Sequence, residues 1–169
     1  GNYVYFQIWP TIIERNAKHP LFAPLAARLP IRKGLQRFTG KAKKFYSKTF
    51  RQVSDEDTYM MTFYLWIAAA LHALSYTDQI VDLNRASEAG YAAAQSALLQ
   101  NATGFNIDLS GLRAENKSGI ALDYDGIEAR TLEFFPLDAL GSFIDKTKAR
   151  ARLSEIDAPK AALLDRLLR

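Results

Sequence analysis

The chain contains twenty consecutive residues without a charged side chain, TYMMTFYLWIAAALHALSYT at positions 58–77. This is about the length that a helix needs to cross a bilayer. The preceding residues favour a different environment, because Ser54 and Asp57 have capping-box spacing and three consecutive acids would face the positive end of the helix dipole. The interior also includes His72, Ser75 and four alanines, which lower the gain from insertion into lipid. We therefore expect a core helix of a soluble domain and no transmembrane span.

The composition is typical of a folded chain, with 49% hydrophobic and 24% charged residues among 169. We expect one globular domain over residues 1–169, because this length can bury a single substantial core. The absence of cysteine excludes disulfides, thiolate nucleophiles and thiolate metal sites, and it fits a reducing compartment. The first charged residue is Glu14, so the opening stretch lacks the cationic leader of a secretory signal. The expected location is therefore cytoplasmic.

Two further helices are expected on either side of the charge-free run. Residues 41–53 place apolar side chains at spacings of three and four, which is typical of an amphipathic helix. Residues 78–100 are rich in alanine and other small residues. Because small side chains let a neighbouring helix approach closely, we expect this second helix to pair with the helix that starts at Ser54 and to form the middle of the fold.

Two segments are predicted to form β-structure. The opening NYVYFQIW, residues 2–9, is rich in aromatic and β-branched residues and is predicted as a strand. Asp125-Gly126 is a typical two-residue hairpin turn, and pairing Tyr124 with Ile127 gives one mostly apolar face. The expected fold class is therefore α+β: a helix-dominated single domain with a central apolar helix pair, an N-terminal strand and a β-hairpin in the C-terminal half.

The C-terminal part is predicted to be helical. Pro136 favours the start of a helix over residues 137–153, whose cations gather toward its C-terminal end as the dipole prefers. A last helix from about Ala158 has an apolar face that can pack on the domain or on a second subunit, made of Ala162, Leu163, Leu164, Leu167 and Leu168. This face is the reason to expect a homo-oligomer.

The most informative functional feature is a basic segment, residues 32–51, which holds eight of the 22 cations and no acid. The rest of the chain carries 14 cations and all 18 acids, a net charge of −4, so the positive charge of the protein is local. Lys43 belongs to the segment, and the residues that we predict to bind an anionic partner are Arg32, Lys33, Arg37, Lys41, Lys44, Lys48 and Arg51.

Three readings of the basic segment remain open. It can be a merely solvated face, it can bind the phosphates of nucleic acid, or it can attract anionic lipid or an acidic protein. Cations before an apolar helix also satisfy the positive-inside pattern of membrane proteins. The aromatics Phe45, Tyr46 and Phe50 fall on the face opposite the lysines, so they are expected to anchor the helix to the core rather than to stack on bases.

Other patterns carry less chemistry. GLQRFTGKA resembles a phosphate-binding loop, but five residues separate its glycines and Ala42 replaces the hydroxyl that would bind magnesium. Asp123 and Glu128 would be neighbours across the hairpin, although no third metal ligand has a fitting spacing. Asp78 and Asp82 are four residues apart, with Arg85 one turn from Asp82 as an ordinary ion-pair partner, and His72 is expected to be a core histidine with a hydrogen-bond partner. We therefore predict no catalytic residue, no metal and no cofactor.

These observations define three hypotheses of different class. The first is a non-enzymatic interaction module whose basic segment binds an anionic partner, most readily nucleic acid. The second is a membrane-peripheral or apolar-ligand-binding protein that uses the amphipathic helix or a pocket beside the charge-free helix. The third, an enzyme centred on His72 or on the pair Asp123 and Glu128, has the least support.

Overall fold

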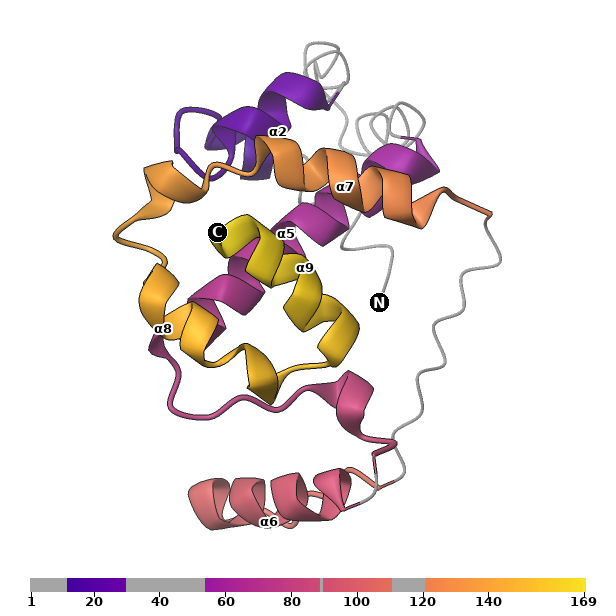
Figure 1. The fold of residues 1–169 in the computed structure, drawn as a ribbon, viewed down its shortest axis with the longest axis vertical. Coiled ribbons are helices and arrows are strands. Elements are labelled where there is room, and N and C mark those ends of the chain that lie inside the picture. Colours follow the sequence, from indigo (N-terminus) through magenta and orange to yellow (C-terminus); the bar gives the residue numbers. More distant parts are fainter. Residues whose placement is uncertain (1–11, 30–53, 89, 111–120) are drawn as a thin grey trace, which may run out of the picture. The chain divides into compact units, whose positions relative to one another are not determined.

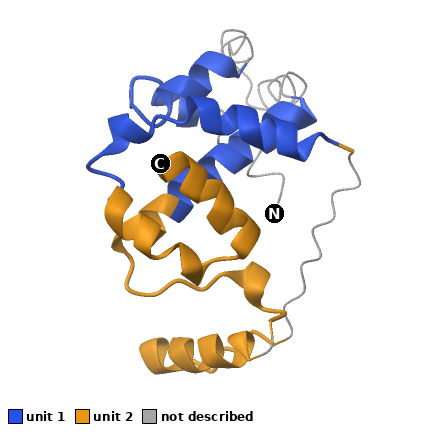
Figure 2. Cartoon of the chain, viewed as in Figure 1, with its two compact units in different colours: residues 1–70, 122–144 blue, residues 71–121, 145–169 orange. Residues whose placement is uncertain are grey.

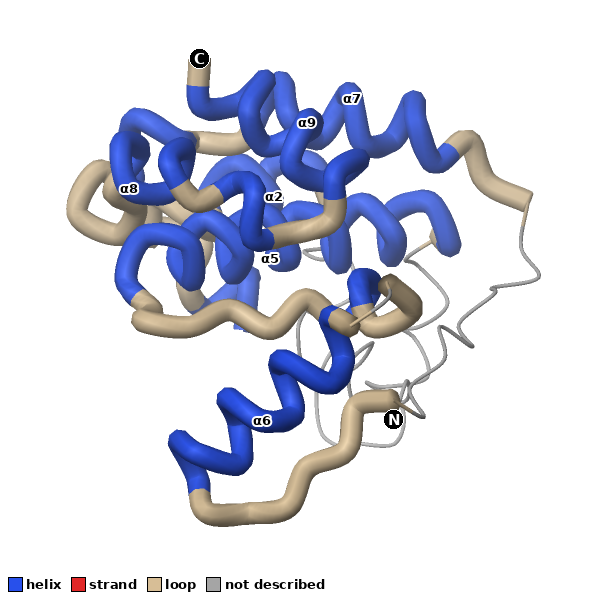
Figure 3. The backbone as a smooth tube through the Cα atoms, turned by 60° about the horizontal axis from the view of Figure 1, so that its bottom comes forward, coloured by secondary structure: helices blue, strands red, loops and turns tan. Residues whose placement is uncertain are grey.

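The computed structural model describes residues 12–29, 54–88, 90–110 and 121–169, which form helices joined by turns (Figure 1). Residues 12–15 are helical. The other α-helices are α2 (Ala23–Arg28), α5 (Asp55–Tyr76), α6 (Tyr91–Thr103), α7 (Tyr124–Phe134), α8 (Lys146–Ala151) and α9 (Ala158–Leu168), and short 3₁₀ helices are η1 (Leu83–Arg85), η2 (Leu137–Leu140) and η3 (Leu153–Glu155). Within these described ranges there is no β-strand (Figure 3). The predicted strand at 2–9 and the predicted helix at 41–53 lie outside them.

The predicted α+β class is wrong, because the segment expected to be a hairpin forms helix α7. Asp123 is the N-cap of α7 and accepts a hydrogen bond from the backbone N–H of Gly126, with Oδ1 3.0 Å from N. Asp125 and Gly126 therefore lie in the first turn of a helix. A β-carbon at Gly126 would lie 2.0 Å from Oδ2 of Asp123, so the glycine leaves room for the cap. The buried residues Ile127 and Thr131 are four positions apart, which is the spacing of one helix face.

The charge-free run forms most of the long helix α5, and its predicted start is confirmed. The backbone N–H of Asp57 donates to Oγ of Ser54 over 3.0 Å, while the Asp57 carboxylate accepts from the hydroxyl and the backbone N–H of Ser54. This capping box precedes the first helical residue, Asp55, and the first turn of the helix contains three acids. In the part of the chain that the structure describes, no helix combines the length and the apolar character that crossing a bilayer requires.

The chain divides into two compact units (Figure 2). Unit 1 comprises Gly1–Ala70 and Leu122–Ile144, and unit 2 comprises Leu71–Ala121 and Asp145–Arg169. The boundary falls inside α5, so this helix contributes residues to both units. Whether the whole chain behaves as one domain stays a prediction.

Tyr64 of α5 is central to the core of unit 1. Its side chain is fully buried, and its hydroxyl donates to the backbone carbonyl of Leu21 over 2.5 Å. Its ring centroid lies 5.6 Å from that of Phe134 and 5.0 Å from that of Phe135. Burial raises the pKa of this phenol above its ordinary value. Other fully buried residues of unit 1 are Ile13, Leu25, Met61, Ile67, Ile127 and Ile144.

In unit 2, polar groups from distant parts of the sequence fix the C-terminal end of α5. Ser75 is buried, and its Oγ accepts the backbone N–H of Asp145 over 3.0 Å. Nη1 of Arg152 donates to the carbonyls of Leu74 and Thr77, at 3.3 and 2.5 Å. The two Arg152 contacts satisfy carbonyl groups that the end of a helix leaves unpaired. Fully buried apolar residues of unit 2 include Leu71, Leu74, Ala149 and Leu164.

The predicted central helix pair is also wrong. Residues 78–88 and Gly90 are not α-helical: the side chain of Asp82 caps the 3₁₀ helix η1, and Gly90, with φ of 77°, precedes α6. A left-handed glycine stops a helix from continuing through it. In α6 only Ala92 is buried, so the small residues of this helix do not form a core.

The C-terminal predictions are confirmed in part. The predicted helix at 137–153 is interrupted: Gly141 ends η2, and α8 starts only after Asp145, whose Oδ1 accepts the backbone N–H of Lys148 over 3.0 Å. The predicted start of the last helix agrees with α9. Leu164 and Leu168 of α9 are buried within the chain, and the predicted homo-oligomer stays a prediction.

Candidate functional site

The basic segment that carries the predicted anionic site lies outside the described residues. This applies to every predicted contact: Arg32, Lys33, Arg37, Lys41, Lys44, Lys48 and Arg51. The structure begins to describe the chain again at Ser54, three residues beyond Arg51. What the described residues contribute to the argument for this site is the position of their own charged side chains and the ion pairs that these side chains form.

The predicted carboxylate pair is not formed as expected. Asp123 caps α7, whereas Glu128 points its Oε1 at the hydroxyl of Tyr59, which donates over 2.5 Å. Tyr59 lies edge-to-face against Tyr124, with ring centroids 4.8 Å apart. Burial, reinforced by the hydrogen bond to Glu128, raises the pKa of the Tyr59 phenol above its ordinary value. A tyrosine that holds its proton this firmly is a hydrogen-bond donor, not a base.

His72 is half-buried on α5, and its ring centroid lies 5.1 Å from that of Tyr76. Throughout the described residues, no three histidine, aspartate or glutamate side chains gather in a way that could hold a metal ion.

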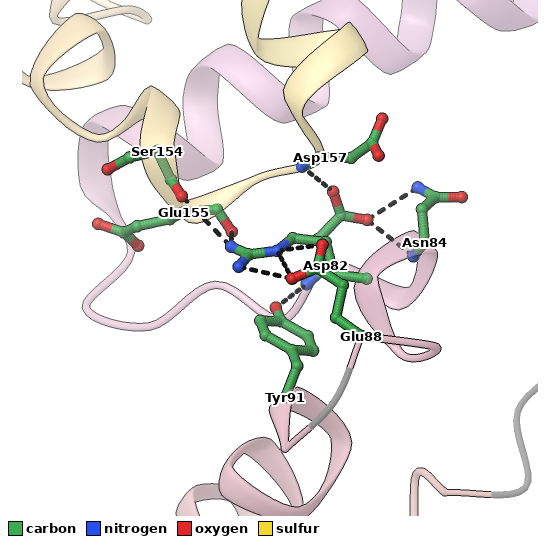
Figure 4. Close-up of polar contacts among 8 residues, drawn as sticks. Asp82, Asn84, Glu88, Tyr91, Ser154, Glu155 and Asp157 are labelled. Carbon is green, nitrogen blue, oxygen red and sulfur yellow. Dashed lines mark hydrogen bonds and ion pairs between the residues drawn. The ribbon is translucent and has the colours of Figure 1, made fainter.

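In unit 2, a cluster of hydrogen bonds surrounds Asp82 and Arg85 (Figure 4). The expected ion pair between Arg85 and Asp82 is replaced by a pair with Glu88: Nε lies 2.9 Å from Oε1, and Nη2 lies 2.9 Å from Oε2. Nη1 of Arg85 donates to the carbonyls of Ser154 and Glu155, at 3.2 and 3.1 Å. The guanidinium carbon also lies 4.5 Å above the ring of Tyr91.

Asp82 forms the other half of this cluster. One carboxylate oxygen accepts the backbone N–H and the side-chain amide of Asn84, at 2.9 and 2.8 Å, and the other accepts the backbone N–H of Asp157 over 2.8 Å (Figure 4). Burial opposes the charged form of Asp82, but the hydrogen bonds from Asp157 and Asn84 outweigh burial, and the pKa of Asp82 lies below its ordinary value.

Two cavities flank Arg85. The first, of about 440 Å³, is lined by Arg85, Glu88, Leu153, Ser154, Ile156, Ala158, Ala161, Ala162 and Asp165. The second, of about 410 Å³, is lined by Asp78, Gln79, Ile80, Arg85, Tyr91, Gln95, Leu98, Ser154 and Glu155. Most donor groups of Arg85 are already used within the protein, so its role here is to join segments of the chain.

Sequence reasoning identified Asp82 and Arg85 but missed most of their partners. Glu88 is three residues from Arg85 and could have been found from its spacing. Asp157 and the carbonyls of Ser154 and Glu155 are about 70 residues away along the chain, and no local pattern signals them. Comparison with protein-family models, with curated proteins and with solved structures finds no match.

Proposed function

We propose that this protein is a non-enzymatic interaction module whose basic segment, residues 32–51, binds an anionic partner, and that the partner is nucleic acid. The observation that carries the proposal is the separation of charge: eight cations and no acid in twenty residues, with a net charge of −4 in the rest of the chain. Such a segment attracts phosphates and releases their counterions on binding. A cytoplasmic location accompanies the proposal, because a chain without cysteine fits a reducing compartment.

Two of the three acids that follow the basic segment are engaged elsewhere, which supports the proposal. Asp57 is held by Ser54 in the capping box of α5. Glu56 forms an ion pair with Arg130 of α7. Two of the three acids closest to the segment therefore already have cationic or hydrogen-bonding partners, which weakens their competition with phosphate for the lysines.

Cations in the described residues are, by contrast, often neutralised by acids. Ion pairs of this kind are Arg85 with Glu88, Arg150 and Arg169 with Asp165, and Arg152 with Glu155. Because exposed positive charge drives attraction of polyanions, the basic segment is the stronger candidate for the contact.

The test is the salt dependence of binding to fluorescein-labelled single-stranded and double-stranded DNA and to RNA of equal length, measured by anisotropy. Replacement of Lys41, Lys44 and Lys48 by Gln should weaken binding and reduce the slope of log K against log salt by about two to three. The control variant replaces three exposed cations outside the segment, Lys18, Lys148 and Arg166, and therefore has the same net charge. Its slope should stay close to that of the wild type.

Three outcomes contradict the proposal. Binding that is indifferent to salt, or that falls equally in both variants, removes the basic segment as the contact. Binding of vesicles with anionic lipid, in the absence of any binding to nucleic acid, replaces the proposal with the membrane-peripheral alternative.

A further inference from the structure

Helix α6 has few apolar anchors. Of the described residues between 83 and 109, only Ala92 and Leu109 are buried. Leu98 is 41% exposed and Phe105 is 73% exposed. Local segments with little buried apolar surface open at a lower free energy than the core of a domain. What holds α6 in place must therefore be sought mainly in polar contacts.

Both ends of α6 are glycines in the left-handed conformation. Gly90 has φ of 77° and Gly104 has φ of 73°, and a β-carbon at either position would meet nothing within 4 Å. The backbone is thus permissive at both ends of the helix. A hydrogen bond from the backbone N–H of Leu109 to Oγ of Ser96, at 3.0 Å, ties the following chain back to α6.

The first residue of α6 is tied to η1. The backbone N–H of Asp82 donates to the hydroxyl of Tyr91 over 2.9 Å, and the guanidinium of Arg85 lies over the Tyr91 ring (Figure 4). The same two residues also contact a segment about 70 residues away in sequence: Asp82 accepts the N–H of Asp157, and Arg85 donates to the carbonyls of Ser154 and Glu155. Asp82 and Arg85 therefore connect α6 to the start of α9.

We propose that Asp82 and Arg85 form a latch, and that the described residues 86–88 and 90–109, including α6, form a strap that this latch holds in place. Release of the latch frees the strap as one piece and leaves α9 folded. Among its described residues the strap has only two buried side chains, whereas α9 retains the buried Leu164 and Leu168 when the latch is lost. Opening also removes one wall of the cavity lined by Tyr91, Gln95 and Leu98. The latch thus determines whether that cavity is formed.

The test uses spin labels, which the absence of native cysteine makes straightforward. The substitutions Leu98→Cys in α6 and Ala162→Cys in α9, both at exposed positions, provide the two attachment sites. The distribution of distances between the two labels is measured by pulsed electron spin resonance. The latch variant is Asp82→Ala with Arg85→Met. The control is Arg150→Gln, which breaks an ion pair with Asp165 that does not involve the strap. The latch variant should show a broader distribution with a longer population, and the control should match the unmodified pair.

Hydrogen exchange separates release of the strap from general unfolding. In the latch variant, exchange in residues 91–103 should accelerate on the order of tenfold, with little change in 124–134 and 158–168. An unchanged distance distribution overturns the proposal. If the latch variant loses protection equally in α6 and α9, or fails to fold, the milder variant Glu88→Gln decides. Equal loss of protection in α6 and α9 in Glu88→Gln as well overturns the proposal. Glu88→Gln removes only the carboxylate that orients Arg85, so it should produce a smaller effect confined to the strap.

Discussion

Gly126 is part of a sequence pattern that led to a wrong prediction, and it nevertheless has a definite role in the structure. Asp-Gly is a strong hairpin signal, yet here the aspartate before it, Asp123, caps a helix and the glycine provides space for the cap. The role of the glycine is therefore steric. It depends on a side chain three positions earlier and not on a left-handed backbone.

This steric role gives a prediction with an unusual sign. Alanine normally favours a helix over glycine, but Gly126→Ala should lower the free energy of unfolding by about 0.5–1 kcal/mol because it displaces the cap. In the background of Asp123→Ala, the same substitution should instead raise the free energy of unfolding by about 0.5 kcal/mol. Urea unfolding of the four proteins measures this coupling. The same sign in both backgrounds would show that the cap and the glycine are independent.

At the scale of elements, the predictions that held rest on contacts between near neighbours in sequence. Ser54 and Asp57 satisfy each other, and the start of α5 was predicted correctly. The same is true of α9, whose first turn contains a proline. Local chemistry was enough in both cases.

The predictions that failed required information from elsewhere in the fold. The helix expected at 78–100 starts only at Tyr91, because Asp82 is held by Asp157 and Gly90 adopts a left-handed conformation. The candidate cluster around Arg85 depends on backbone carbonyls about 70 residues away. A carbonyl has no sequence signature, so spacing could indicate Arg85 and Asp82 but could not assemble the cluster.

The capping box of α5 can be tested directly. Ser54→Ala should lower the free energy of unfolding by about 1 kcal/mol, because the backbone N–H of Asp57 loses its acceptor at the helix start. Thr62→Ala is the matched control: Thr62 is exposed, and its hydroxyl donates to the carbonyl of Thr58 within the same helix. This control should be neutral or slightly stabilising in thermal or urea unfolding. Equal losses in the two variants would contradict a specific role for the cap.

At the scale of the whole molecule, α5 is the element that both units share. Met61, Tyr64 and Ile67 are buried in unit 1, and Leu71 and Leu74 are buried in unit 2. A continuous helix transmits a loss of stability along its own hydrogen bonds. The two cores should therefore respond together to a change in the middle of α5.

Ala69→Gly tests this coupling, because Ala69 is exposed and its replacement removes no packing. The substitution should cost about 1 kcal/mol and lower the protection of amides in both α7 and α9 by about fivefold. Ala93→Gly, an equivalent change at an exposed position of α6, should leave both helices unaffected. Hydrogen exchange with mass spectrometry measures each helix separately. A loss of protection in only one of α7 and α9 would show that the units are energetically independent.

Helix α6 has only one buried side chain, and this has a consequence for how the sequence of the protein can evolve. A helix that contributes one buried side chain places few demands on the identity of most of its other residues. Substitutions, and even insertions between the two flanking glycines, would therefore accumulate there at little cost, while Tyr91 and its partners stay fixed. This stretch is where lineages of the protein would diverge first, and where foreign sequence could be grafted most readily.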